Sequence, residues 1–289
     1  MDVVCIGDVM LDVRADAGAL ARGGDVHGRV LVQPGGTSAN AAVWAASSGA
    51  AASVIGAIGD DVAGDLLLAA LAERGVGIDG VVRSAEPTGT MLVVHEAGER
   101  SMVADRGANA SLVASDLPAR IEAEAVLISG YLLLQPPTTG VAVAAIERAD
   151  AAIVAVETAS WPLVASFGVE AFFEATVSAG AVLANGREAA VLTGCDPDDA
   201  CRKLGERFRI AAVKRGADGA CLSVDGVFAA SGSPVVEERD PTGAGDAFDG
   251  VLLASLARGS DARAALTAAC AAGATVAASL SAWPERRRG

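Results

Sequence analysis

Hydrophobic runs and amphipathic stretches alternate along the first 80 residues of the chain. The runs "DVVCIGD", which ends at Gly7-Asp8, "GRVLVQPGG" and "ASVIGAIGDD" have the length and composition of strands. Ser38–Ala50 and residues 61–76 ("DVAGDLLLAALAERGV") have the apolar spacing and the end signals of helices. Strands that alternate with helices are typical of a parallel sheet covered by helices on both faces. The pattern therefore predicts a doubly wound, mostly parallel α/β fold.

Residues 81–103 break this alternation. The stretch "TGTMLVVHEAGERSMVAD" contains two β-like runs about a short turn at residues 96–99, with no helix after them, which is a hairpin signal. Together with the polar stretch 14–32, it predicts a small β-sheet lid outside the main sheet, formed by segments of about 13–33 and 85–104.

Alternation then resumes towards the C-terminus. The runs "AEAVLISGYLLL", "AAIVAVE", "GAVLAN", "IAAVKRG" and "GACLSVDG" are predicted as successive strands, with helices between several of them. The most apolar segment, Ala264–Leu280, is rich in small residues and is predicted as a buried helix. The chain contains no internal repeat and no low-complexity linker, so we expect residues 1–289 to form a single domain.

The composition narrows the class of protein. Hydrophobic residues make up 52% of the chain and the mean hydropathy is +0.42, but no run reaches the ~18 to 20 apolar residues that span a bilayer. The start "MDVVCIGD" is unlike a signal peptide, and five cysteines without a C-x-x-C pair fit a reduced chain. We therefore expect a cytoplasmic protein with no membrane partner.

Charge excludes further classes of function. The formal net charge is −14, and no stripe of Lys and Arg is present, so no nucleic-acid partner is expected. Only two histidines and two lysines occur, and neither lysine follows a G-x-x-x-x-G loop. A His-rich metal site and a Walker A loop are thereby excluded. Any phosphate must be bound by backbone amides, arginine or a metal ion.

The stretch "RDPTGAGDAFDG" combines a glycine-rich turn with an acid at the start of an apolar helix. Such a turn exposes backbone N–H groups at the positive end of a helix dipole, and this arrangement binds anions. A carboxylate beside it, from Asp246, would accept the proton of an attacking hydroxyl during phosphoryl transfer. The alternative is a plain turn in which Asp246 caps the helix.

The longer string from Asp240 to Phe248 resembles the second signature of the ribokinase-like (PfkB-type) sugar kinases. Four other stretches resemble further marks of that family in the same order: "IGDVMLD", "PGGTSANAA", "NGRE" and "VKRGADGA". The resemblance spans about residues 3–280. It implies an ATP-dependent kinase that phosphorylates a hydroxyl of a small sugar or sugar acid, with ATP, Mg²⁺ and the sugar as its ligands.

The resemblance also implies roles for individual residues. Asp246 would be the catalytic base, with an anion hole formed by Gly243, Ala244 and Gly245. The substrate would be bound by Asp12, Gly35, Gly36 and Asn40. From the residues alone, Asp12 has the alternative of a loop acid and Asn40 that of a helix-start residue.

The nucleotide would be bordered by Asn185, Lys214, Gly216, Thr242 and Gly245. Asn185 and Glu188 also form a capping-box pattern, and both roles are compatible if Glu188 orients a water on Mg²⁺ rather than binding the ion directly. Lys214 has the alternative of a surface residue at a strand end. Cys270 either lines the adenine pocket or is a small buried thiol.

Arg106 and Asp240 are the least determined residues of the set. Arg106 follows the lid and either binds a substrate carboxylate or phosphate or is an exposed residue. Asp240 would bind a monovalent cation such as K⁺. The segment that completes this cation site in many members, Gly-Ala-x-x-x-x-Pro, reads "SLSAWPERRRG" here, without the glycine. The sequence therefore leaves K⁺ activation open.

Two other functions remain as alternatives. A nucleoside kinase of the same fold would need an aromatic-lined pocket, and aromatic residues make up only 3% of this chain. A sugar or nucleotide sensor without catalysis would have lost the base, whereas Asp246 is present. Because lids in this family often pair between subunits, the resemblance implies a homodimer.

Overall fold

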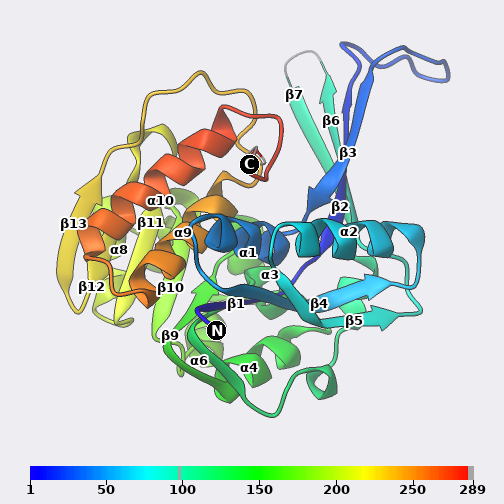
Figure 1. The fold of residues 1–289 in the computed structure, drawn as a ribbon. Helices are drawn as coiled ribbons and strands as arrows, with labels where there is room; N and C mark the ends of the chain where they lie inside the picture. Colours follow the sequence, from blue (N-terminus) through cyan, green and yellow to red (C-terminus); the bar gives the residue numbers. More distant parts are fainter. Residues whose placement is uncertain (97–98, 286–289) are drawn as a thin grey trace.

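A nine-stranded sheet separates two layers of helices in the computed structural model, which describes residues 1–96 and 99–285 (Figure 1). The strand order is β13-β12-β11-β10-β9-β8-β1-β4-β5. Neighbours from β11 to β5 are parallel, while β12 and β13 are antiparallel additions at one edge. The strands are β1 (Val3–Ile6), β4 (Ala52–Gly59), β5 (Gly77–Ser84), β8 (Ile121–Ile128), β9 (Ala149–Glu157), β10 (Ala181–Asn185), β11 (Ile210–Lys214), β12 (Ala220–Val224) and β13 (Val227–Ser231).

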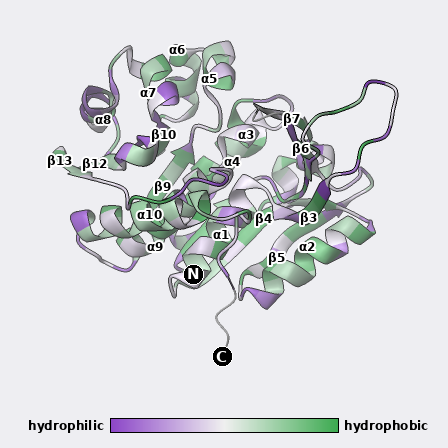
Figure 2. Cartoon of the chain, turned by 90° about the horizontal axis from the view of Figure 1, so that it is seen from above, coloured by the Kyte–Doolittle hydropathy of each residue, from purple (hydrophilic) through white to green (hydrophobic). Residues whose placement is uncertain are grey.

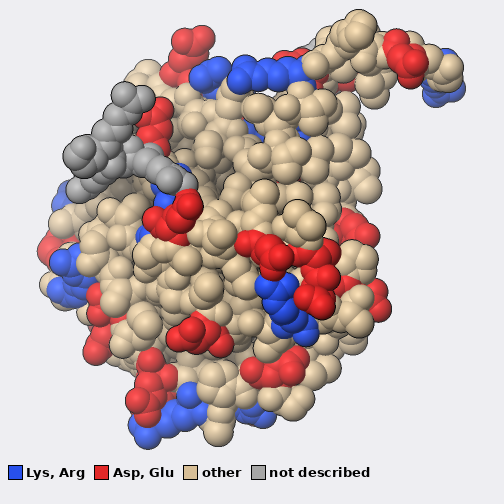
Figure 3. Space-filling view, turned by 45° about the vertical axis from the view of Figure 1, so that its right-hand side comes forward, with Lys and Arg blue, Asp and Glu red and all other residues tan. Residues whose placement is uncertain are grey.

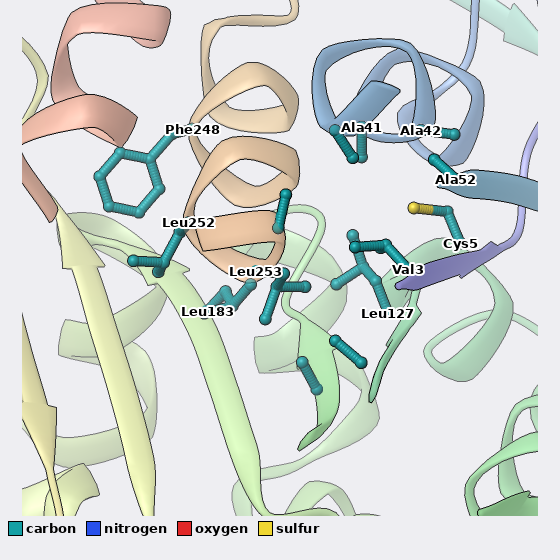
Figure 4. Close-up of a cluster of buried hydrophobic side chains, with 14 of the residues drawn as sticks. Val3, Cys5, Ala41, Ala42, Ala52, Leu127, Leu183, Phe248, Leu252 and Leu253 are labelled. Carbon is teal, nitrogen blue, oxygen red and sulfur yellow. The ribbon is translucent and has the colours of Figure 1, made fainter. Parts of the chain in front are cut away.

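The sheet is buried on both faces, because successive strand residues point to opposite sides. Val3 and Cys5 of β1 belong to one hydrophobic cluster, and Val4 and Ile6 belong to the other. Figure 4 shows the first cluster, in which strand side chains such as Leu127 meet those of covering helices. Strands buried on both faces read as continuous apolar runs, which is why the sequence pattern found most of them.

Helices cover the sheet in two groups (Figure 2). The first face carries α1 (Thr37–Ser47), α2 (Val62–Glu73), α9 (Ala244–Ala257) and α10 (Ala262–Ala277). The second face carries α3 (Gly130–Leu133), α4 (Thr139–Arg148), α5 (Trp161–Phe167), α6 (Val169–Ala175), α7 (Gly186–Thr193) and α8 (Pro197–Gly205). Short 3₁₀ turns form η1 (Gly107–Ser111), η2 (Ala114–Asp116) and η3 (Gly216–Asp218).

Polar residues fix where several helices begin. The side chains of Asp61, Asp196 and Asp261 each accept a hydrogen bond from a backbone N–H in the first turn of α2, α8 and α10. No helix within the described residues is long and apolar enough to cross a membrane. In the view of Figure 3, acidic and basic side chains are interspersed over the surface.

A separate four-stranded sheet projects from the edge of the body (Figure 1). Its order is β3 (Arg29–Gly35), β2 (Met10–Asp16), β6 (Thr90–Glu96) and β7 (Glu99–Asp105). Residues 97–98, within the expected hairpin turn, lie outside the described residues. We call this element the small sheet. The expected lid segments, 13–33 and 85–104, overlap these four strands, and their bounds differ from those of the strands by a few residues.

The order of the strands places the site. Chain order reverses at β1, which lies between β8 and β4, so this is the switch point where α/β folds bind ligands. Asp8 follows β1, and Glu157, Asn185 and Lys214 are the last residues of β9, β10 and β11. All four residues therefore lie at the carboxyl-terminal ends of the parallel strands, on the same side of the molecule.

The expected doubly wound, mostly parallel fold is confirmed, with three local differences. Gly77–Ser84 is a main-sheet strand, although its mixed composition did not predict one. Val227–Ser231 adds a final antiparallel strand that was also not predicted. The run "GYLL" forms α3 instead of continuing the preceding strand, because Ser129 caps it through the Tyr131 N–H.

We predict that Gly250→Ala lowers the free energy of unfolding by about 1–3 kcal/mol. A methyl group at this buried position of α9 would collide with the Ala41 backbone of α1, so the two helices would have to separate. Chemical denaturation measures the loss. The matched control is Gly140→Ala in α4, where a methyl group meets nothing within 4 Å; it should be neutral or stabilise by about 0.4–1 kcal/mol. Equal effects of the two variants would contradict the packing argument.

Candidate active site

The first turn of α9 presents backbone amides. Gly243 is its N-cap residue, with a φ of 83° that favours glycine. The N–H of Ala244 donates to the Pro241 carbonyl at 3.0 Å and is used within the turn. The N–H groups of Gly243, Gly245 and Asp246 have no protein acceptor in the part of the chain that the structure describes. The amides available to an anion are therefore those of residues 243, 245 and 246.

The Asp246 carboxylate lies in the same turn. Burial raises the pKa of Asp246 to about 6, and the hydrogen bond that Asn40 Nδ2 donates to Oδ2, at 2.8 Å, acts in the opposite direction. Trp283 Nε1 donates to Asn40 Oδ1 at 2.8 Å and so orients the carboxamide. Asn40 is thus a partner of the candidate base itself, held from the segment that follows α10.

Asp12 and the two glycines expected to bind substrate form one group. Asp12 lies on β2 opposite Gln33 of β3 and is 7% exposed. Burial, assisted by the charge of Asp246, raises the pKa of Asp12 to about 7. A Cβ at Gly35 would collide with the Asp12 carboxyl group, and one at Gly36 with the Asp8 carbonyl. The Gly-Gly turn is therefore required by close packing beside Asp12.

Asp246 also lines a cavity of about 510 Å³, whose wall does not include Asp12 or Asn40. Its wall comes from the ends of β9, β10 and β11, from α7 and η3, from the loop after β13 and from α9 and α10. Among the residues expected at the nucleotide, the wall contains Asn185, Glu188, Lys214, Gly216, Gly245 and Cys270, and it also contains Ala244 and Asp246. Thr242 and Asp240 lie in the preceding loop and are not part of the wall.

Asn185 and Glu188 form the capping box that their spacing predicts. Asn185 Oδ1 accepts from the N–H of Glu188 at 3.1 Å, and the Asn185 N–H donates to Glu188 Oε2 at 2.8 Å. Glu188 Oε1 accepts from Asn185 Nδ2 at 2.6 Å, and Oε2 also accepts from the Thr158 hydroxyl. Glu188 is 2% exposed, so this carboxylate has a fixed orientation at the cavity wall.

The Lys214 side chain is 14% exposed, so Lys214 is not the surface residue that was its alternative. Its Nζ donates to Asp249 Oδ2 at 2.7 Å, and its side chain packs beside Gly245. Burial alone would lower the pKa of Lys214, but the carboxylates of Asp249, Glu157 and Glu188 outweigh it and raise the pKa. Glu157 also lines the cavity, and its burial raises its own pKa well above the usual range.

Arg106 is largely buried, which excludes its alternative of an exposed residue. Its Nη2 donates to Asp8 Oδ1 at 2.8 Å, Nε is 3.3 Å from Asp8 Oδ2, and Nη1 is 3.3 Å from the Thr138 hydroxyl. The side chain is 11% exposed. The guanidinium is thus neutralised by Asp8 at the switch point of the sheet.

Asp240 is paired with an arginine of the small sheet. The guanidinium of Arg14 forms an ion pair with Asp240 Oδ2 and donates to the Leu280 carbonyl. Asp240 Oδ1 accepts from the N–H of Thr242 at 2.8 Å. The expected place of a monovalent cation therefore contains a side-chain cation.

Comparison with known proteins identifies the family of the chain. A model described as "pfkB family carbohydrate kinase" matches residues 1–284. The chain belongs to the pfkB family of carbohydrate kinases. It is 32% identical over 252 residues to an ATP-dependent ribose-1-phosphate kinase of Halopiger xanaduensis, covering 84% of this chain and 80% of that protein. It is 28% identical to a 2-dehydro-3-deoxygluconokinase of Thermoproteus tenax, covering 83% and 78%.

Solved structures show the pfkB fold. An adenosine kinase from Sinorhizobium meliloti superimposes with a TM-score of 0.87 at 23% identity, covering 98% of this chain and 95% of that one. A putative ribokinase II from E. coli, in complex with ATP and Mg²⁺, gives 0.86 at 24% identity, covering 96% and 93%. The expected family and fold are both confirmed.

Sequence reasoning missed several residues of this candidate site. Trp283 orients Asn40, Asp249 binds Lys214, and Arg14 binds Asp240. Asp249 had a local signal, since it lies three residues after Asp246 and thus one helical turn further along α9. Trp283 and Arg14 had none, because their partners are more than 200 residues away in the sequence.

We predict that Asp246→Asn stabilises the folded protein at neutral pH. Because the folded pKa is raised from 3.8 to about 6, the carboxyl group favours folding below pH 3.8, and that contribution is lost as the pH rises through about 6. At ~1.4 kcal/mol per pH unit, the variant should gain up to about 3 kcal/mol above pH 6 and little at pH 4. Denaturation at several pH values measures the difference.

The control for this comparison is Asp79→Asn, which alters an exposed carboxylate of β5. A gain for Asp246→Asn that is the same at pH 4 and pH 7, or is matched by Asp79→Asn, would contradict the role of burial.

Proposed function

We propose that this protein transfers the γ-phosphoryl group of ATP to a hydroxyl of a small sugar or sugar acid. The observation that carries the proposal is the first turn of α9, where the Asp246 carboxylate occurs together with three amides that have no acceptor among the described residues. Asp246 lines the cavity, while Asn40 binds the same carboxylate and Asp12 lies close enough to feel its charge.

Asp246 is the general base of the proposed reaction. With a pKa of about 6 it is mostly ionised at neutral pH yet remains basic enough to accept the proton of a bound hydroxyl. The hydroxyl oxygen then bonds to the γ-phosphorus while the bond from that phosphorus to the bridging oxygen of ADP breaks. The amides of Gly243, Gly245 and Asp246 stabilise charge on the transferred group. Ala244, expected in this role, contributes through the turn rather than through its own N–H.

ATP fits the cavity by size and lining. A volume of about 510 Å³ is within the range of small-molecule sites. Cys270 and its neighbours on α10 form an apolar side of the cavity. Asn185, Lys214 and Gly216 line the same cavity as Gly245 and Asp246, which belong to the proposed anion-binding turn, residues 243–246. The ribose-1-phosphate kinase relative is named as ATP-dependent, and the E. coli neighbour contains ATP and Mg²⁺, which supports the donor. Thr242 acts indirectly, through its backbone bond to Asp240.

Mg²⁺ fits this cavity as an ion coordinated mainly by phosphate oxygens and water molecules. The described residues contain no cluster of three His, Cys, Asp or Glu side chains placed to hold a metal ion. Mg²⁺ commonly binds phosphates and keeps several waters. Glu188, fixed by three hydrogen bonds at the cavity wall, would orient one of these waters. The bound ion would neutralise phosphate charge.

The acceptor sugar lies against Asp12, Gly35, Gly36 and Asn40 in this proposal, below the small sheet. The small sheet is the lid of a single domain over residues 1–289, and its closure would exclude water so that the sugar hydroxyl is phosphorylated. A carboxylate or phosphate of the acceptor would have to compete with Asp8 for the Arg106 guanidinium. The scarcity of aromatic residues disfavours a nucleoside acceptor.

The outer face of the small sheet supports the proposed homodimer. Four hydrophobic side chains on this face are 39–65% exposed: Val30, Val32, Leu92 and Val103. The strand register places all four on one face. Asp12 and Arg14 alternate with them on the opposite face. A second copy of this chain would cover the apolar face symmetrically. All five cysteines are free thiols, consistent with the proposed cytoplasmic location.

We predict that wild-type protein releases ADP from Mg-ATP with one member of a panel of sugars, sugar acids, sugar phosphates and nucleosides. Asp246→Asn should lower kcat at least about 100-fold while ATP still binds, because it removes the base and keeps the shape. A coupled ADP assay and calorimetric ATP titration measure the two effects. ATP binding without turnover on any panel member would favour the sensor. A nucleoside as the preferred acceptor would reassign the substrate class.

We predict that Val32→Lys shifts the protein from dimer to monomer, because a charge would be buried at the proposed contact. Light scattering after size-exclusion chromatography measures the mass. Val177→Lys is the matched control: this valine is 80% exposed in the turn after α6 and should leave the dimer intact. A monomeric wild type at micromolar concentration would reject the homodimer.

A further inference from the structure

We propose that Arg14 is a built-in cation that positions the anion-binding turn and takes the place of a monovalent metal ion, so that this kinase is independent of K⁺. The proposal rests on the proposed function only in assigning phosphate binding to the amides of residues 243, 245 and 246. Arg14 is a positioning residue, since it acts on the loop before α9 and not on the reacting atoms.

The contacts of Arg14 join three parts of the chain. The residue lies on β2 of the small sheet and is 7% exposed. Its Nη2 pairs with Asp240 Oδ2 in the loop before α9, and its Nη1 donates to the Leu280 carbonyl, at 2.5 Å, in the segment after α10. Asp240 is 2% exposed, so its negative charge requires a cation nearby.

Asp240 connects Arg14 to the anion-binding turn. Its Oδ1 accepts the N–H of Thr242, the residue immediately before Gly243. The N–H groups of Arg239 and Asp240 both donate to the Ala277 carbonyl, at 2.7 and 3.1 Å, which fixes the loop to the end of α10. The direction of the Gly243 and Gly245 amides therefore depends on the carboxylate that Arg14 neutralises.

The donor set around Asp240 does not fit a metal ion. Alkali cations, like the hard cations Mg²⁺ and Ca²⁺, prefer oxygen ligands. Asp240 Oδ2 and the Leu280 carbonyl oxygen both contact the Arg14 guanidinium. Gln33 Nε2 also donates to the Leu280 carbonyl, at 3.0 Å, and His95 Nε2 lies 3.8 Å from Asp240 Oδ2. A metal ion would meet nitrogen donors and a fixed positive charge.

These nitrogen groups come from three neighbouring strands of the small sheet. Arg14 is on β2, Gln33 on β3 and His95 on β6. Asp12 is on the same face of β2 as Arg14, two residues earlier. Strand β2 thus carries both Asp12, which is proposed to bind the substrate, and Arg14, which positions the anion-binding turn. In this chain, the Arg14 guanidinium occupies the place beside Asp240 where K⁺ would bind.

The first test uses wild-type protein in KCl, NaCl and choline chloride at equal ionic strength. We expect kcat and the ATP dissociation constant to agree within about twofold in the three salts, because the charge at Asp240 is already supplied. A several-fold rise of kcat, or of ATP affinity, in K⁺ over choline would overturn the proposal. Calorimetric ATP binding gives this answer even if no acceptor supports turnover, so failure of the proposed function is recognised separately.

The second test removes the side-chain cation. Arg14→Ala should lower kcat, or ATP affinity, at least about tenfold, since it removes the guanidinium that forms an ion pair with the buried Asp240 carboxylate. Added guanidinium chloride at a non-denaturing concentration should recover part of the loss, which a merely structural role would not show. Arg29→Ala, an exposed arginine of β3, is the matched control. Wild-type behaviour of Arg14→Ala, or a loss that guanidinium leaves unchanged, would reject the assignment.

A third variant keeps the test open if Arg14→Ala does not fold. Arg14→Lys retains the charge but loses the second hydrogen-bonding arm of the guanidinium. We expect it to fold, to retain cation independence and to lose less activity than Arg14→Ala. A gain of K⁺ activation in Arg14→Lys would show that charge alone does not replace the ion.

Discussion

A carboxylate that leaves water loses its hydration, and at Asp246 this loss has to be offset by partners that the fold brings together. Asn40 comes from α1. The amides without an acceptor in the described part of the chain, and the helix dipole, come from the N-cap and first turn of α9, and the charge of Lys214 comes from the end of β11. These partners do not fully offset the lost hydration, so the pKa of Asp246 stays raised, at about 6. The parallel sheet is what brings them to one edge.

The other buried charges follow the same physical rule. Lys214 with Asp249, Arg106 with Asp8, and Arg14 with Asp240 each join two different elements, with the cation and the acid both largely removed from water. Such pairs are weak evidence for stability, because desolvation opposes their attraction. They do restrict geometry, because moving either element would leave a charge without its partner. The three pairs therefore restrict the positions of the loops around the α9 turn.

Local pattern was sufficient for much of the fold. β1, β4, α1 and α2 were predicted because continuous apolar runs and helical spacing are properties of adjacent residues. β5 was not, since Asp79 and Arg83 interrupt its pattern and only pairing with β4 makes it a strand. The motif around Asp246 was likewise local, and so was the Asn185–Glu188 box. The use of the Ala244 N–H inside the turn and the side-chain pairing at Asp240 depended on three-dimensional contacts that no single stretch of sequence reveals.

The segment after α10 is part of the site, although the sequence suggested only a departure from the family pattern. Ala282 packs where a Cβ on Gly243 would come within 2.7 Å, its carbonyl accepts from Trp44 Nε1, and Trp283 holds Asn40. The chain contains three tryptophans, and two of them therefore report on this one region. Intrinsic fluorescence of the unmodified protein is consequently a direct optical signal of how Asp246 and its carboxamide partner, Asn40, are held.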